Sequence, residues 1–204
     1  MPDTGKPRLP AAERLAVTRA RLLDAVLDTV AQCGYTATST TEVARRSGLT
    51  RGAQLHHFGT KDQMMVAAAE HLAARTRATD IQARLAHLGS GPERLRTALT
   101  IMARMFIGPI PAAYIELYVA SRAHPELRPA LADLDVANRD LVRALFGDQL
   151  LARGGPEFDQ ILDLAMYALR GMALDAHISG EDEHQRRGAL ILALTPYLER
   201  LLEV

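Results

Sequence analysis

The stretch STTEVARRSGLTRGAQLHHFGTK at residues 39–61 decides the fold of this chain. Its pattern predicts two short helices joined by a tight turn. Ser39 and Glu42 have the spacing of a capping box, in which the hydroxyl and the carboxylate each satisfy a backbone N–H left free at a helix start. Gly48 offers the positive φ at which a helix ends, and residues 51–58 predict the second helix. This is the geometry of a helix-turn-helix, with the second helix in the place of a recognition helix.

Helical patterns flank this stretch on both sides. Before it, apolar residues recur along residues 11–33 at the spacing of one helix face, and Gly34 follows as a stop signal. After it, Thr60 and Gln63 repeat the capping-box spacing and predict a long helix that continues through Ala78. The first stripe is formed by Leu15, Leu22, Val26, Val30 and Cys33, and the second by Met64, Met65, Ala68 and Leu72.

The rest of the chain keeps a helical pattern and shows no strand alternation. Helices are predicted at residues 93–107, 111–122 and 126–146, followed by a loop at 154–156. Two apolar stripes remain, one formed by Phe158, Leu162, Ala165, Leu169, Met172 and Ala176 and the other by Leu190, Leu194, Leu198 and Leu201. Pro196 is expected to kink or restart the last helix. The fold class is therefore all-α, with about nine helices in total.

Composition predicts a folded cytoplasmic protein rather than a membrane protein. The chain has 204 residues, of which 48% are hydrophobic, so it can bury a core. No apolar stretch approaches the roughly 20 residues that span a bilayer, and the N-terminus lacks the apolar region of a signal peptide. The one cysteine, Cys33, cannot form a disulfide within the chain and is expected to be a small core residue.

Charge is unevenly distributed, although the net charge is zero. Residues 1–61 carry nine Lys and Arg against five Asp and Glu, whereas residues 62–204 carry fifteen against nineteen. The basic third coincides with the helix-turn-helix, which favours a polyanion partner, although a solvated basic face is also common. The chain thus divides into a flexible arm at residues 1–10, a DNA-binding domain at 11–61 and a larger helical domain at 62–204.

A supporting helix, the segment TTEVARRSGLTRGAQLHHFGTKDQM at residues 40–64 and a long helical remainder together resemble the tetracycline-repressor (TetR) family of bacterial transcriptional regulators. The resemblance covers residues 14–72, and YIELYVASRAHPEL at 114–127 is similar to a segment often seen in that family's effector-binding domains. It implies a homodimer that binds a palindromic double-stranded DNA operator through two heads and a small-molecule effector inside each body. It also implies dimerisation through the last two helices, at residues 156–178 and 185–203.

The resemblance also assigns the residues that contact DNA. A recognition helix needs donors for phosphate and groups that read base edges. Thr40 and Thr41 are placed at a helix start against phosphate, and Lys61 is placed against phosphate at the start of the next helix. The recognition helix carries Arg51, Gly52, Ala53, Gln54, Leu55, His56 and His57. For Arg45 and Arg46, a solvated face and phosphate contacts are equally compatible with the pattern.

The order at residues 54 and 55 departs from the family's pattern. The family commonly has an apolar residue where Gln54 stands and a tyrosine or polar residue where Leu55 stands. Either Leu55 reads a thymine methyl while Gln54 is partly buried, or the helix is rotated and Gln54 reads a base. His56 and His57 point about 100° apart on a helix, so the pair cannot chelate one metal ion.

The predicted helices of the larger domain concentrate adaptable and aromatic side chains, for which a ligand cavity competes with a plain core role. The candidates for ligand contact are Met102, Met105, Phe106, Tyr114, Tyr118, Arg122, Met166, Tyr167 and Arg170. Few buried charges among them favour a hydrophobic or amphipathic ligand. No metal or cofactor is expected, and the acidic run at residues 181–184 is interpreted as a solvated turn.

These patterns favour a DNA-binding transcriptional regulator, in particular a repressor that a small hydrophobic or amphipathic ligand releases from its operator. The alternative is an all-helical interaction module that does not bind DNA. Enzyme activity is not expected, because the chain carries no His-Glu-x-x-His, no Gly-rich phosphate loop and no Gly-x-Ser-x-Gly.

Overall fold

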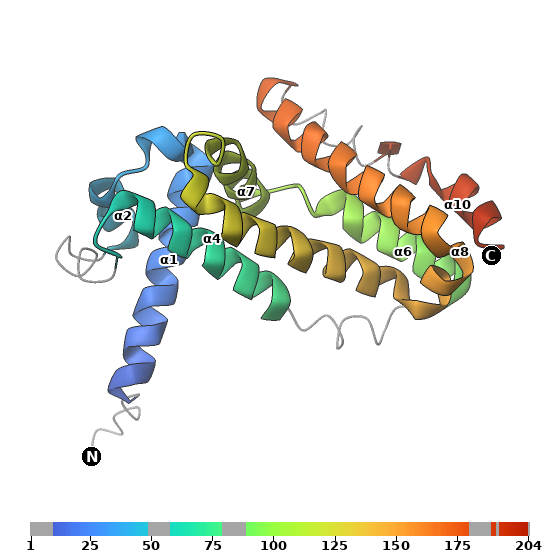
Figure 1. Cartoon of the computed structure of the whole chain (residues 1–204), viewed down its shortest axis with the longest axis horizontal. Coiled ribbons are helices and arrows are strands. Elements are labelled where there is room, and N and C mark those ends of the chain that lie inside the picture. Colours follow the sequence, from blue (N-terminus) through green and yellow to red (C-terminus); the bar gives the residue numbers. More distant parts are fainter. Residues whose placement is uncertain (1–9, 49–57, 79–88, 180–188, 191, 204) are drawn as a thin grey trace, which may run out of the picture.

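A computed structural model describes residues 10–48, 58–78, 89–179, 189–190 and 192–203, and these ranges are helical with no strand. The elements are α1 (Ala11–Ala37), α2 (Thr40–Ser47), α4 (Lys61–Ala78), α6 (Gly91–Arg104), α7 (Pro109–Ala120), the 3-10 helix η1 (Pro125–Leu127), α8 (Arg128–Ser179) and α10 (Thr195–Leu201). Figure 1 shows α1 and α2 at one end of the molecule and α6 and α10 at the other, with α8 spanning the distance between them. The predicted all-α class is confirmed.

The regular turns of α1 end at Gly34, as the glycine predicts. Its φ of 76° and ψ of 168° suit glycine alone, and a Cβ there would lie 3.2 Å from Oε2 of Glu116 on α7. The same carboxylate oxygen accepts the Tyr35 N–H at 3.3 Å. The break in α1 is therefore fixed by α7 as well as by the conformational freedom of glycine.

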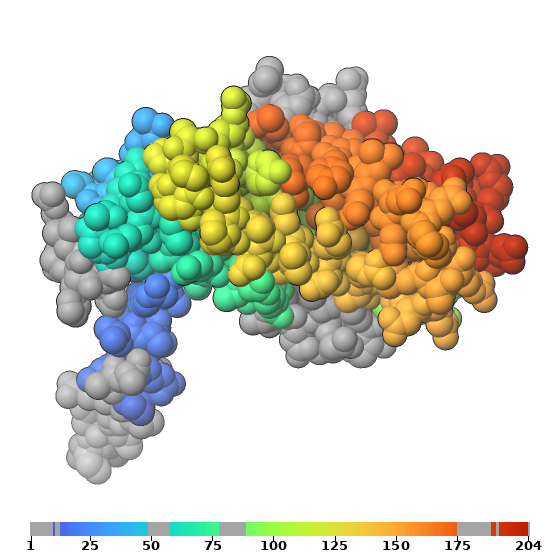
Figure 2. All heavy atoms as spheres, in the orientation of Figure 1, coloured from blue at the N-terminus to red at the C-terminus, as the bar shows by residue number. Residues whose placement is uncertain are grey.

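The apolar stripe of α1 is buried only beyond its first turns. Leu22, Val26 and Val30 are fully buried, whereas Leu15 is 54% exposed, which corrects the expectation for that residue. Figure 2 shows the reason, because the N-terminal part of α1 projects from the main mass of the molecule. The helices that cover the later turns, chiefly α4 and α7, do not extend along it.

The two predicted helix starts use their caps. Ser39 Oγ accepts the Glu42 N–H at 3.2 Å, and α2 ends at Gly48 with a φ of 69°. The Glu42 carboxylate bonds to Arg45 and Arg46 instead of the Ser39 N–H, so only half of the capping box predicted there forms. At the start of α4 the capping box is complete. Thr60 Oγ1 accepts the Gln63 N–H at 3.2 Å, and the Thr60 N–H donates to Gln63 Oε1 at 3.1 Å. Each bond gives an acceptor to a backbone N–H that has no hydrogen-bond partner within the helix.

The core is built around α4. Its Met64, Met65 and Ala68 are fully buried, and Leu72 is 4% exposed. α4 packs against α1, α7, η1 and α8, so it needs apolar residues on more than one face. Full burial of a side chain such as Met or Leu contributes roughly 1.5–3 kcal/mol, so these residues of α4 contribute several kcal/mol to the core that α4 shares with α1, α7 and α8.

α6 and α7 meet at a sharp bend. Gly108, with a φ of 110°, precedes Pro109 at the start of α7, and Pro92 likewise lies in the first turn of α6. Both helices begin two residues before the predicted positions, because proline fits the first turn of a helix. Among the described residues no single helix is long and apolar enough to cross a membrane, and these two pass that test only as a pair bent by 64°.

α8 folds back on itself as two antiparallel arms. Gly147 and Gly155 leave the helical region with φ angles of 75° and 56°. Ion pairs join the arms at Arg143–Asp159, at Arg139–Asp163 (3.0 Å) and at Arg170–Asp135 (2.9 Å). The loop predicted at residues 154–156 is therefore a bend within a helical run. The described ranges hold seven α-helices. About nine were predicted; two of them are joined within α8, and most of the one predicted at 51–58 lies outside the described residues.

The chain restarts as a helix near its end, as Pro196 predicts. Pro196 lies in the first turn of α10, where its missing N–H costs nothing. Leu198 is fully buried, whereas Leu190 is 59% exposed, so the predicted stripe is buried only in part. α10 packs against α6, and Arg96 on α6 donates to Glu199 at 2.6 Å.

Removal of the cap of α4 should destabilise the fold measurably. Thr60→Ala should lower the free energy of unfolding by about 1 kcal/mol, because the Gln63 N–H loses its acceptor. The matched control is Thr100→Ala, whose hydroxyl bonds to the Arg96 carbonyl within its own helix and which should change stability by less than about 0.5 kcal/mol. Urea unfolding curves measure both values, and equal effects would contradict the role of the cap.

Candidate functional site

The helix-turn-helix is described on both sides of its recognition helix. At the start of α2, Thr40 is half-buried and Thr41 is exposed. The predicted contacts of the recognition helix lie outside the described residues, and these are Arg51, Gly52, Ala53, Gln54, Leu55, His56 and His57. Which of its residues reads bases therefore stays a prediction.

The charged side chains of α2 pair with one another. The two carboxylate oxygens of Glu42 accept from Arg45 at 2.9 and 2.7 Å, and Oε1 also accepts from Arg46 Nε at 2.6 Å. Hydrogen bonds from Arg45 and then from Arg46 lower the pKa of Glu42 to about 2. Arg46 also bonds to Gln32 and, at 3.2 Å, to Sγ of Cys33, which is half-buried rather than in the core. These contacts tie α2 to α1 and offset the charge of both arginines.

Lys61 joins the start of α4 to the end of α1. Its Nζ donates to the Thr36 carbonyl at 2.9 Å and lies 4.9 Å from the centre of the Tyr35 ring. An ammonium group has three donors, so this contact leaves donors for a phosphate. Burial and the Asp62 carboxylate raise the pKa of Tyr35 to about 12. The protonated hydroxyl donates to Asp62 at 3.3 Å.

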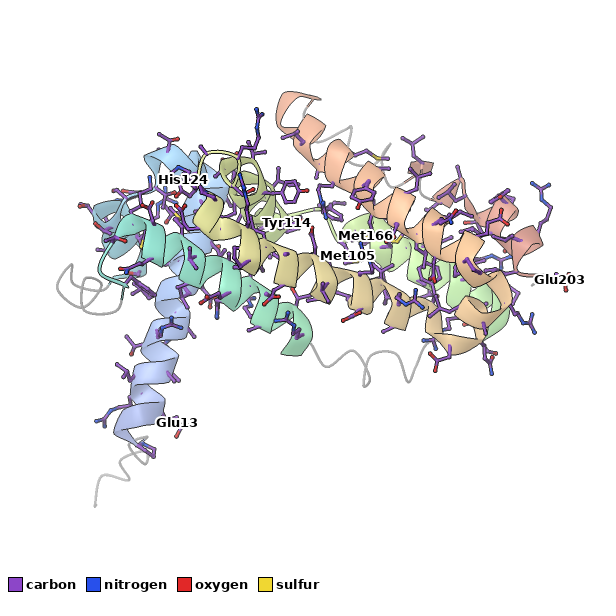
Figure 3. The ribbon with its side chains drawn as sticks, in the orientation of Figure 1. Glu13, Met105, Tyr114, His124, Met166 and Glu203 are labelled. Carbon is purple, nitrogen blue, oxygen red and sulfur yellow. The ribbon has the colours of Figure 1, made fainter. Side chains whose placement is uncertain are left out.

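A cavity of about 250 Å³ lies between α4, α7 and α8. Its wall is formed by Leu72, Thr76, Met105, Phe106, Ile107, Ile110, Pro111, Tyr114, Leu134, Asn138 and Leu141. Figure 3 places Tyr114 and Met105 near the middle of the molecule, between α7 and α8. A mostly apolar wall with a few polar groups is typical of small-molecule sites.

The structure brings only part of the predicted ligand set to this wall. Those on the wall are Met105, Phe106 and Tyr114. Those elsewhere are Met102 in the core, Met166 beside a separate hollow of about 40 Å³, the exposed Tyr118, Arg122 and Tyr167, and the ion-paired Arg170. Residue type and helical spacing do not show which of several packed faces borders a gap, which is why the predicted set is wider than the wall.

Two polar residues of the wall, Thr76 and Asn138, are not among the ligand-contact residues predicted from the sequence. Thr76 lies four residues after the buried Leu72 on α4, and Asn138 lies between Leu134 and Leu141 on one face of α8. A polar residue inside an otherwise apolar stripe was the signal available for both. Together with Tyr114, they are the polar side chains of the wall that can orient a ligand's polar end.

A polar network adjoins the cavity through Tyr114. Its hydroxyl donates to Asp135 Oδ1 at 2.5 Å, and Arg170 donates to the same oxygen at 2.9 Å. The guanidinium lies 4.7 Å from the ring centre of Tyr118 and 5.7 Å from that of Tyr167. Burial, followed by the bond to Asp135, raises the pKa of Tyr114. Arg170 Nε is buried with no hydrogen-bond partner among the described residues.

Known proteins are similar to this chain in sequence and in architecture. Residues 22–68 match a family model described as bacterial regulatory proteins, tetR family. Over 165 residues the chain is 30% identical to the HTH-type transcriptional regulator CymR of Pseudomonas putida, covering 80% of this chain and 81% of that one. Over 191 residues it is 31% identical to an uncharacterized HTH-type transcriptional regulator of Mycobacterium tuberculosis, covering 90% and 95%.

A crystal structure extends the comparison to the whole fold. A transcriptional regulator from Saccharomonospora viridis in complex with choline matches with a TM-score of 0.67. The match covers 88% of this chain and 95% of that one at 15% sequence identity. At this identity the likeness concerns the fold alone.

The network around Arg170 should contribute measurably to the stability of the fold. Asp135→Ala should lower the free energy of unfolding by about 2–3 kcal/mol, because Arg170, 14% exposed, and the Tyr114 hydroxyl lose their shared acceptor. Asp133→Ala is the control, since that carboxylate is 70% exposed and lies 3.7 Å from Arg77. Its effect should stay below about 0.5 kcal/mol. Guanidinium unfolding at neutral pH measures both, and a small effect of Asp135→Ala would rule out a stabilising network.

Proposed function

Because this chain belongs to the TetR family of DNA-binding transcriptional regulators, we propose that it is a repressor that a small apolar or amphipathic ligand releases from its operator. Residues 11–61 form the DNA-binding domain, with an arm at 1–10, and residues 62–204 bind the ligand and dimerise. As a regulator of genes it acts in the cytoplasm. One observation carries the proposal: α4 begins a few residues after the segment predicted as the recognition helix and also lines the cavity with Leu72 and Thr76.

On DNA, the start of α2 and the start of α4 hold phosphates on either side of the recognition helix. Thr41 is exposed in the first turn of α2, where free backbone N–H groups and the helix dipole favour an anion. Lys61 lies in the first turn of α4 and keeps donors beyond its bond to Thr36. Residues 51–57 then read base edges in the major groove.

The ligand is small, because the cavity of about 250 Å³ is slightly below the range of about 300–1,000 Å³ that is typical of small-molecule sites. Its apolar part packs against Leu72, Met105 and Phe106, and its polar end bonds to Asn138 or Tyr114. The choline complex of the S. viridis regulator supports a small amphipathic ligand for this fold.

The dimer forms through the outward face of the second arm of α8. The stripe predicted as its interface is core instead, because Phe158, Leu162 and Leu169 are buried within one chain. A second stripe on the same arm is exposed, with Leu164 at 68% and Tyr167 at 59%. Leu174 and, beyond α8, Leu190 and Tyr197 extend the exposed apolar surface. A second copy covers such a face isologously, within residues 156–178 and 185–203, and matches a palindromic operator.

The switch follows from the position of α4. A ligand releases DNA only if it prefers the conformation that binds the operator weakly. A molecule in the cavity contacts Leu72 and Thr76, and close packing transmits their displacement along α4 towards Lys61. In a dimer this changes the spacing of two recognition helices that must reach half-sites about 34–36 Å apart.

Lys61→Ala should weaken binding to every DNA sequence alike. A lost phosphate contact should also reduce the slope of log affinity against log salt by about one unit. Arg139→Ala, which removes one positive charge from α8 and breaks the ion pair with Asp163, controls for net charge. Fluorescence anisotropy over a salt series measures both, and an unchanged slope for Lys61→Ala refutes the phosphate contact.

A charge on the outward face of α8 should separate dimer formation from folding. Leu164→Glu should give a folded monomer that has lost tight operator binding, because Leu164 is 68% exposed in one chain. Leu169→Glu should fail to fold, because Leu169 is 2% exposed and lies in the core. Light scattering and circular dichroism distinguish the two results. If Leu164→Glu remains a dimer, the interface does not lie on this face of α8.

A cavity-filling substitution tests the function as a whole. In a gel mobility-shift assay, the wild type should bind DNA that contains the region upstream of its own gene. A compound found by thermal-shift screening of small amphipathic molecules should release the protein from this DNA. Met105→Trp should still bind this DNA but resist release, because the indole occupies the cavity. Ile101→Trp, at a position 37% exposed, is the control and should respond normally. Absence of DNA binding in the wild type would favour an all-helical interaction module.

A further inference from the structure

Three potential metal ligands meet where α4 begins. Asp62 lies in the first turn of α4, His124 precedes η1 and Glu126 lies within it. One ligand atom from each residue lies within 4.8 Å of those of the other two. Figure 3 labels His124 beside α7, at the end of the molecule where α1 and α2 lie. This cluster differs from the adjacent histidines at 56–57 and the acidic run at 181–184, because its members come together from positions 62 and 124–126 only in the fold.

The spacing of these atoms is close to that of a coordination sphere. Nδ1 of His124 and Oε1 of Glu126 are 3.2 Å apart. Ligand atoms bound tetrahedrally to Zn²⁺ at about 2.0–2.1 Å are separated by about 3.3 Å. The carboxylate of Asp62 is exposed, so a side-chain rotation that moves its oxygen by about 1 Å can bring the third ligand into position without moving the backbone.

Neighbouring groups orient two of the three ligands. The Tyr35 hydroxyl donates to Asp62 Oδ1 at 3.3 Å, and the Tyr35 ring packs against the imidazole of His124 with 4.4 Å between centroids. Outer groups of this kind fix ligand orientation in metal sites.

The site is open to ions from solvent. Asp62 and Glu126 line a surface hollow of about 710 Å³, whose wall also includes Gln63, Glu70 and the cationic Arg19. Such a hollow gives an access route and room for water molecules to complete the coordination of an ion held by three protein ligands. It is separate from the apolar cavity, with which it shares no lining residue.

We propose that Asp62, His124 and Glu126 form a binding site for a divalent transition-metal ion such as Zn²⁺ or Co²⁺. One imidazole and two carboxylates match the ligand preferences of these ions, and two carboxylates with a neutral imidazole offset the charge of the ion. The bound ion cross-links the first turn of α4 to the turn between α7 and η1. Because only the folded chain assembles the three ligands, the ion stabilises the fold.

Titration of the full-length, tag-free protein with CoCl₂ tests the site. We expect one equivalent of Co²⁺ per chain, with visible absorption bands of a bound ion that ZnCl₂ abolishes by displacement. Both ions should raise the melting temperature by several degrees. His124→Gln and Asp62→Asn should each weaken Co²⁺ binding at least tenfold, and Glu126→Gln serves as a further variant if either fails to fold. Binding should also weaken in acid, because protons compete for the ligands.

His71→Gln is the matched control. His71 Nε2 also lies 3.0 Å from a carboxylate oxygen, of Asp24, but the neighbour that shares this oxygen is the cation Arg75 rather than a second acid. This variant should bind Co²⁺ as the wild type does. The proposal is overturned if the wild type shows no saturable Co²⁺ binding. It is equally overturned if folded His124→Gln and Asp62→Asn both retain wild-type affinity, or if His71→Gln loses it.

Discussion

The burial of α4 on several sides is the constraint on which the rest of the structure depends. Its Met64, Met65 and Ala68 are fully buried, and the helix packs against α1, α7, η1 and α8. Interiors packed at this density respond to a local change by shifting whole elements rather than by deforming side chains one at a time. In the proposed function, a helix that follows the segment predicted to read DNA and also belongs to the core couples the two.

The contacts around α4 differ along its length. At its start they are polar, with Lys61 bonded to Thr36 and Asp62 to Tyr35, so the end of α1 moves with it. Further along they are apolar, and beside Leu72 and Thr76 the packing leaves a cavity of about 250 Å³. A gap in an otherwise dense core is the place where a ligand can shift a helix with least loss of contact. The polar start then carries the shift to the DNA-binding surface.

Local features were predictable from sequence because they depend on neighbouring residues. The break at Gly34, the cap at Ser39 and the complete box at Thr60 and Gln63 all form where the pattern places them. Contacts between distant positions were not predictable, and the Tyr114–Asp135–Arg170 network is an example. No spacing rule links residues that meet only after the chain has folded back.

The outward face of α8 shows a second limit of sequence reading. Leu162 and Leu169 lie on one helical stripe, and Leu164 and Leu174 lie on another. Periodicity identifies both stripes as apolar faces. Only the fold shows that Leu162 and Leu169 pack inside one chain while Leu164 is 68% exposed and Leu174 is 51% exposed. Because burial within a chain and burial between chains need the same residue types, sequence alone does not show which stripe is left exposed for a second copy.

The central claim is that the cavity and the operator act on one conformational equilibrium through α4. Calorimetry of an identified ligand, titrated into the free protein and into the operator-bound protein, tests it most directly. Linkage requires the operator to weaken ligand binding by the same factor by which the ligand weakens operator binding, about 5- to 150-fold for typical allosteric couplings. Matching factors above one are the predicted result. Equal ligand affinity for the free and the operator-bound protein would contradict the account.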